Sequence, residues 1–124
     1  MIAKPESIVA HMDLYMEIMF TKSELSRAER EMMAVVVSAA NGCEYCEMHH
    51  AQALNHYWKN DEKISRLRTD FEAADLTKRE LVLCSFANLL TVNPEAYRDE
   101  KYLAPVKKIG ISDNGILDAT LVVS

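Results

Sequence analysis

Apolar side chains recur at the spacing of an α-helix along almost the whole chain, and this periodicity is the feature that most restricts the fold. No stretch alternates apolar and polar residues for long enough to predict a β-strand. A chain of 124 residues is about the size of one domain with one core. We therefore predict a single all-α domain over residues 1–124, built from helices packed against one another.

Capping boxes and glycines mark the helix ends. Ser26 with Glu29, and Thr77 with Glu80, have the spacing in which a hydroxyl and a carboxylate each accept from the other residue's backbone amide at a helix start. Asn41-Gly42 is predicted to adopt the left-handed backbone that lets a helix stop, and Gly110 marks a later helix end. Together with the apolar periodicity, these signals predict helices over approximately 7–20, 26–41, 43–59, the first half of 60–75, 77–92, 97–109, and from about 113 onward.

Three of these helices have informative apolar surfaces. Residues 32–37 are apolar on every side of their helix, so that helix should be buried all round. The last helix ends in the apolar run 121–123 without a cap, so either a partner subunit covers this end or the domain lacks a C-terminal portion. A methionine-rich stripe on the first helix predicts core or a subunit interface, and its members are Ile8, Met12, Tyr15, Met16 and Met19.

Charge and length exclude several classes of function. Fourteen basic against nineteen acidic residues give a net charge of -5, which is the wrong sign for a nucleic-acid partner. The longest apolar stretch, residues 32–40, is about half the length that spans a bilayer, so we expect no membrane partner. No uninterrupted apolar segment follows the first five residues, so we expect no cleaved signal peptide and a cytoplasmic location.

One segment, Cys43-Glu44-Tyr45-Cys46-Glu47-Met48-His49-His50, concentrates the reactive side chains. On a helix, spacings of three, four and seven return to one face, so Cys43, Cys46 and His50 should share a stripe. An imidazole one turn away can accept a thiol's proton, and a second thiol can close an intramolecular disulfide. Gly42 suggests that Cys43 lies at a helix N-terminus, whose amides favour the thiolate. The segment therefore predicts redox chemistry.

Two other interpretations of this segment stay open. The cysteines could simply pack while the histidines are solvated, or zinc could bind Cys43, Cys46, His49 and His50. Four ligands within eight residues are unlike the two separated ligand pairs of ordinary zinc sites. We therefore expect neither a metal nor a cofactor.

Two further residues have chemistry that depends on their surroundings. Glu31 directly precedes the apolar run, where a poorly hydrated carboxylate could relay a proton to His50 or to a cysteine. The alternative is that Glu31 interacts only with the dipole of its own helix. Cys84 lies in an apolar helix and is expected to be a core residue.

This constellation resembles a known family. Arg30-Glu31, the apolar helix that follows, Ser38-Ala39-Ala40-Asn41-Gly42 and the spacing Cys43-x-x-Cys46-x-x-x-His50 are similar to the alkylhydroperoxidase D-like (AhpD-like) peroxidases of the carboxymuconolactone decarboxylase superfamily. The chain is especially similar to the peroxidase-related branch, whose motif reads Cys-x-Tyr-Cys followed by His-His.

The resemblance implies a function and an assembly. Cys43 and Cys46 would be the redox pair, with Glu31 and His50 as its proton relay. The substrate would be a hydroperoxide or a protein disulfide, the electron donor a dithiol, and the assembly a homo-oligomer, either a trimer or a hexamer. Longer relatives continue past the equivalent of Ser124.

Within this reading, several points stay open. Well-characterised members carry His where this chain has Tyr45, so an accessory proton carrier is missing; Tyr45 and His49 are secondary candidates. The spacing to His50 favours Cys46 as the attacking thiol, whereas a helix N-terminus favours Cys43. The rival functions are a lactone decarboxylase, which has no need of two thiols, and a non-catalytic helical oligomer with oxidation-sensing thiols.

Overall fold

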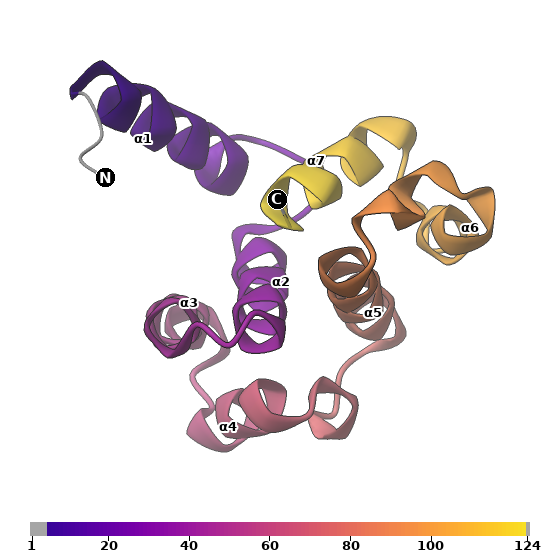
Figure 1. Ribbon diagram of the computed structural model, residues 1–124. Helices are drawn as coiled ribbons and strands as arrows, with labels where there is room; N and C mark the ends of the chain where they lie inside the picture. Colours follow the sequence, from indigo (N-terminus) through magenta and orange to yellow (C-terminus); the bar gives the residue numbers. More distant parts are fainter. Residues whose placement is uncertain (1–4, 124) are drawn as a thin grey trace.

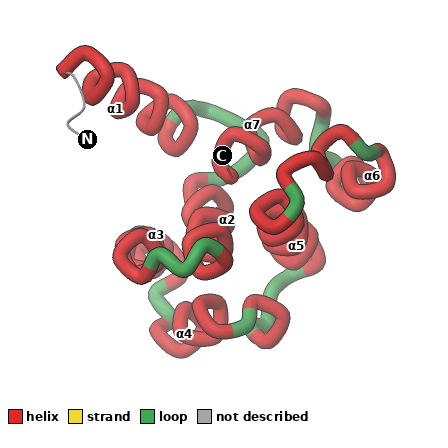
Figure 2. Tube along the Cα trace, viewed as in Figure 1, coloured by secondary structure: helices red, strands yellow, loops and turns green. Residues whose placement is uncertain are grey.

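The computed structural model describes residues 5–123, and all regular structure within that range is helical. Figure 2 shows these helices joined by short loops. The α-helices are α1 (Pro5–Phe20), α2 (Arg27–Ala40), α3 (Glu44–Trp58), α4 (Asp61–Thr69), α5 (Lys78–Val92), α6 (Glu100–Lys108) and α7 (Asp113–Val123). Two short 3-10 helices, η1 (Phe71–Ala73) and η2 (Pro94–Arg98), follow α4 and α5. The predicted all-α fold is confirmed.

Helix α2 is the centre of the fold. It packs against α3 on one side and α5 on the other, and α4 and α7 lie near its two ends (Figure 1). Each of residues 32–37 is at most 9% exposed, so the predicted all-round burial of this helix is confirmed. No helix within residues 5–123 is long and apolar enough to cross a membrane.

Most of the predicted helix ends are where the sequence put them. Both capping boxes form, Ser26 with Glu29 and Thr77 with Glu80. Gly42 and Gly110 have φ values of 71° and 90°, in the left-handed region. The prediction for Asn41 is wrong, because its φ of -85° is right-handed and its amide still bonds to α2 carbonyls. Gly42 alone supplies the left-handed turn.

Two predicted helix starts are shifted, and in each case a capping residue lies where helix was expected. Cys43 has extended backbone and is the N-cap of α3, so this helix begins at Glu44. Asp99 is the N-cap of α6, where its carboxylate accepts from the amide of Lys101. Tyr97, predicted as helical, lies in η2 instead. A side chain that satisfies the free amides at a helix start outweighs the periodicity of the residues before it.

Helix α1 projects from the rest of the chain in Figure 1 and meets it near α2 and α7. Of its methionine stripe, Met19 is buried, whereas Met12 and Met16 are 52% and 49% exposed. The side chains of Ile8 and Tyr15 lie outside the described residues. Among the described side chains of the stripe, Met19 at the C-terminal end contributes to the core, and a subunit interface for the exposed methionines stays a prediction.

The end of α1 is tied to α2 by Arg30, which is 3% exposed. Its guanidinium donates to the carbonyls of Ile18, Thr21 and Leu25, with distances of 3.0 Å to Ile18 and 3.1 Å from Nε to Leu25. Carbonyls at a helix C-terminus lack partners within their own helix, so this buried cation satisfies groups that would otherwise be costly to bury. Arg30, the residue directly before Glu31, therefore has a structural role.

Candidate active site

The candidate site lies where the loop after α2 leads into α3. Gly42 turns the chain, and the amide of Cys43 donates to the carbonyl of Ser38 at 3.0 Å. This short connection places Cys43 at the N-terminus of α3, as the sequence suggested. The free amides and the positive end of the helix dipole therefore lie beside the first sulfur.

Cys43 and Cys46 are joined by a disulfide, with their Cα atoms 5.4 Å apart, a separation typical of disulfides. The amide of Cys46 also donates to Sγ of Cys43 at 3.3 Å. Both residues are half-buried. Because an amide that donates to sulfur stabilises the charged form more than the neutral one, this geometry favours a Cys43 thiolate when the bond is reduced.

An acid and an imidazole meet across the interface of α2 and α3. Oε2 of Glu31 lies 2.7 Å from Nδ1 of His50, and their side chains are 8% and 16% exposed. A carboxylate at Nδ1 holds the ring with Nε2 available to exchange protons. Glu31 therefore has a partner beyond the dipole of its own helix, because its carboxylate contacts His50 of α3. Glu29 is the carboxylate that accepts from the amide of Ser26 at the start of α2.

The disulfide and the acid–imidazole pair are neighbours on α3. His50 follows Cys46 by four residues, which is one helical turn and the same face. The structure therefore brings four predicted site residues into one region: Cys43 at the cap, Cys46 in the first turn, His50 in the next, and Glu31 from α2. A pair of sulfurs with an adjacent proton carrier has the parts for two-electron thiol chemistry.

The two secondary candidates lie at the surface. Tyr45 is 74% exposed, and its ring stacks on His49 with centroids 6.3 Å apart. The ring of His49 in turn meets the edge of His50 at 5.7 Å. Ring contacts thus connect solvent to His50 along α3.

Among the described residues, no group of three or more His, Cys, Asp or Glu side chains is placed to hold a metal ion.

One ion pair that reaches the segment of the two cysteines was missed by the sequence reasoning. Nε of Arg68 on α4 lies 2.9 Å from Oε1 of Glu47, the residue directly after Cys46. Twenty-one residues separate the two, so no helical spacing connects them. Only the packing of α4 against α3 brings this cation to residues 43–50, which are called the redox segment below.

The third cysteine has a different environment. Cys84 lies on α5 with no solvent exposure, as predicted for a core residue. Burial, aided by the negative charge of Glu80, raises the pKa of the Cys84 thiol to about 12. A thiol held neutral and away from solvent is a poor nucleophile.

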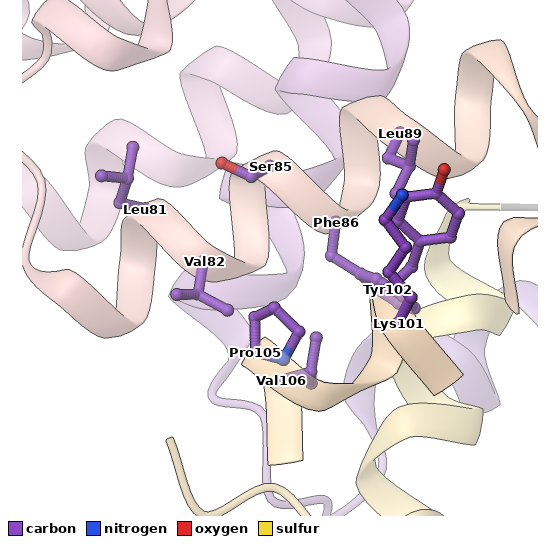
Figure 3. A pocket seen from close by; sticks show the side chains of 9 residues that line it. All are labelled: Leu81, Val82, Ser85, Phe86, Leu89, Lys101, Tyr102, Pro105 and Val106. Atoms are coloured by element: carbon purple, nitrogen blue, oxygen red, sulfur yellow. The ribbon is translucent and has the colours of Figure 1, made fainter. Parts of the chain in front are cut away.

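A groove of about 300 Å³ lies between α5 and α6 (Figure 3). Its walls are mainly apolar and are formed by Leu81, Val82, Ser85, Phe86, Leu89, Lys101, Tyr102, Pro105 and Val106. None of the candidate site residues lines it. A second hollow of about 290 Å³ includes Asn41, two residues before Cys43, and the ends of α5 and α7.

Comparisons with known proteins identify a family and two solved structures to which the chain is similar. A model described as the carboxymuconolactone decarboxylase family matches residues 5–88, more than half of the chain. No curated protein matches it.

Two solved structures share the fold over 97% of the chain, each with a TM-score of 0.90. An uncharacterized peroxidase-related protein from Silicibacter sp. TM1040 is 31% identical to the chain. An uncharacterized peroxidase-related protein from Ralstonia eutropha JMP134, described as an alkylhydroperoxidase AhpD core, is 24% identical, a level that shows the fold alone. The chain spans 62% and 63% of their lengths.

Proposed function

The chain belongs to the carboxymuconolactone decarboxylase family, and we propose that within this family it is an AhpD-like thiol peroxidase or disulfide reductase. The family match and the peroxidase-related neighbours confirm the resemblance seen in the motif. The observation that carries the proposed activity is the Cys43–Cys46 disulfide next to the 2.7 Å contact between Glu31 and His50.

The first half of the proposed reaction starts from the two reduced thiols. His50 takes the proton of Cys46, and the Glu31 carboxylate stabilises the resulting imidazolium. The Cys46 thiolate attacks the terminal oxygen of an organic hydroperoxide, and the O–O bond breaks. The leaving alkoxide takes the proton from His50 and departs as an alcohol, and Cys46 becomes a sulfenic acid.

The second half closes the disulfide. The Cys43 thiolate attacks the sulfur of the Cys46 sulfenic acid, the S–O bond breaks, and hydroxide leaves as water with one proton. The two electrons that reduce the hydroperoxide thus come from the two thiols. A dithiol donor then restores them by thiol–disulfide exchange. With a protein disulfide as substrate, the same exchange runs in the opposite direction.

The order of the two cysteines is part of the proposal. The spacing of one helical turn between Cys46 and His50 supports Cys46 as the attacking thiol. The hydrogen bond that the Cys46 amide donates to the Cys43 sulfur supports Cys43 instead. Alkylation of the reduced protein at increasing pH separates the two, because the thiol with more thiolate reacts first. We further propose a cytoplasmic location, since a dithiol donor must keep the pair reduced. The family resemblance also supports the proposal of a homo-oligomer, either a trimer or a hexamer.

The test is consumption of cumene hydroperoxide with dithiothreitol as the donor. We expect turnover by the wild type, loss in Cys43→Ser and Cys46→Ser, and retention in Cys84→Ala, the matched control. Equal turnover in all four proteins would contradict the proposal. Activity on a lactone substrate that survives both serine substitutions would favour the decarboxylase alternative.

A further inference from the structure

The redox segment, residues 43–50, contains a carboxylate close in sequence to both cysteines. Glu47 follows Cys46 directly and lies one turn after Cys43, whose carbonyl accepts from the Glu47 amide at 2.9 Å. A negative charge near a sulfur disfavours the thiolate, which is the reactive form of a cysteine. The Glu47 side chain is only 14% exposed, so water screens its charge less than it would on an open surface.

Arg68 meets this carboxylate from a separate helix. The distance from its Nε to Oε1 of Glu47 is 2.9 Å, and its side chain is 36% exposed. The other cations of α4 have different partners, because Arg66 pairs with Glu62 and Lys63 lies 4.4 Å over the ring of Trp58. Arg68 is thus the α4 cation that is bound to the redox segment.

The other charged or titratable groups around the disulfide do not take over this part. On α3 these are Glu44, which adds negative charge, Tyr45, His49 and His50. From α2 comes Glu31, whose carboxylate is bonded to His50. Arg68 is therefore the permanent positive charge that the described contacts bring to the redox segment.

We propose that Arg68 is a positioning residue for the redox pair: it neutralises the Glu47 carboxylate and holds it toward α4, so that the neighbouring sulfur can ionise. This inference rests on the proposed thiol chemistry, but it concerns the reactivity of the thiols, which can be measured without any peroxide. It makes α4, which carries none of the reactive groups, a determinant of the pH at which the site works.

The experiment measures the rate at which iodoacetamide modifies Cys43 and Cys46 in the reduced protein between pH 5 and 9, with each site quantified by mass spectrometry. The variants are Arg68→Met, Arg68→Lys, Glu47→Gln and the double variant Glu47→Gln/Arg68→Met. We expect Arg68→Met to slow alkylation about three- to tenfold near pH 6.5 and to raise the midpoint of the pH profile by about 0.5 to 1 unit. Arg68→Lys should keep the wild-type midpoint.

The double variant is the decisive one. If Arg68 acts through the charge of Glu47, removal of both charges restores the wild-type midpoint. If the ion pair only holds α4 against α3, the double variant is no better than Arg68→Met, and this result would overturn the inference. Identical midpoints in all variants would overturn it as well. Thermal unfolding of each variant identifies any that fail to fold. If Arg68→Met is among them, Glu47→Gln tests the charge, because an Arg68 without its partner carboxylate should lower the midpoint below that of the wild type.

The two proposals can fail separately. In one outcome, the midpoint shifts in Arg68→Met and is restored in the double variant, but the protein consumes no hydroperoxide. This outcome would support the role of Arg68 and contradict the peroxidase activity. Hydroperoxide turnover with an unshifted midpoint in Arg68→Met would support the peroxidase activity and contradict the proposed role of Arg68.

Discussion

The start of α3 and the middle of α5 present the same side chain in two environments. Cys43 and Cys46 are half-buried at a helix N-terminus, next to an imidazole, a carboxylate and a paired arginine. Cys84 is fully enclosed by apolar side chains, and burial raises its pKa to about 12. The difference shows that position in the fold, rather than residue type, decides which thiol can do chemistry.

The largest expected effect is in thiol reactivity itself. At pH 8, the reduced protein should react with a thiol reagent at Cys43 and Cys46 at least a thousandfold faster than at Cys84, because a pKa of about 12 leaves almost no thiolate there. Titration with a chromogenic disulfide should count two thiols in the native protein and three in denaturant. A native count of three would end the contrast between the two regions.

The next effect concerns the imidazole that only one of the regions has. We expect His50→Ala to lower hydroperoxide turnover about a hundredfold, the range for loss of a general acid–base group. The matched control is His56→Ala, since His56 is exposed on the same helix and its ring meets Tyr57 rather than a carboxylate. Equal losses in the two variants would mean that His50 has no special part.

A smaller effect is expected for the residue that orients this imidazole. Glu31→Gln keeps the size of the side chain but removes the charge that stabilises a protonated His50, so we expect turnover to fall about tenfold. The pH dependence of turnover should also change, which a purely structural loss would not cause. Unchanged turnover at every pH would remove Glu31 from the proposed relay. Circular dichroism serves as the folding control.

The smallest effect concerns stability at alkaline pH, and it belongs to the core cysteine. The unfolded chain releases the Cys84 proton above pH 9, whereas the folded protein holds it until about pH 12. Unfolding is therefore increasingly favoured between these values, at about 1 kcal/mol per pH unit. Urea unfolding at pH 8 and pH 10 should show a larger loss of stability in the wild type than in Cys84→Ala. Parallel losses would contradict the burial argument.

Local signals predicted most of the helices. The capping boxes at Ser26 and Thr77 and the stop at Gly110 depend on contacts within a few residues, so the sequence specifies them directly. The shifted starts of α3 and α6 also have a local cause, because in each case the capping residue, Cys43 or Asp99, lies inside the stretch that the periodicity predicted as helix. Boundaries are less certain than helices for this reason.

The site was predicted unevenly. Cys43, Cys46 and His50 lie within eight residues, so helical spacing alone puts them together. The pairing of Glu31 with His50 depends on how α2 packs on α3. Before the structure, the position of Glu31 next to the apolar run offered His50 as one of several partners, and the family resemblance favoured it. Arg68 comes from a third helix and had no signal in the sequence.

The sequence by itself determined an all-helical chain, a buried central helix and a compact group of thiols and histidines, because each depends on periodicity or spacing along one helix. Only the tertiary structure decided that the carboxylate of Glu31 faces His50 and that Arg68 reaches Glu47. The physical reason is that these contacts join separate helices, and the packing of helix faces, which no local pattern encodes, determines which side chains meet.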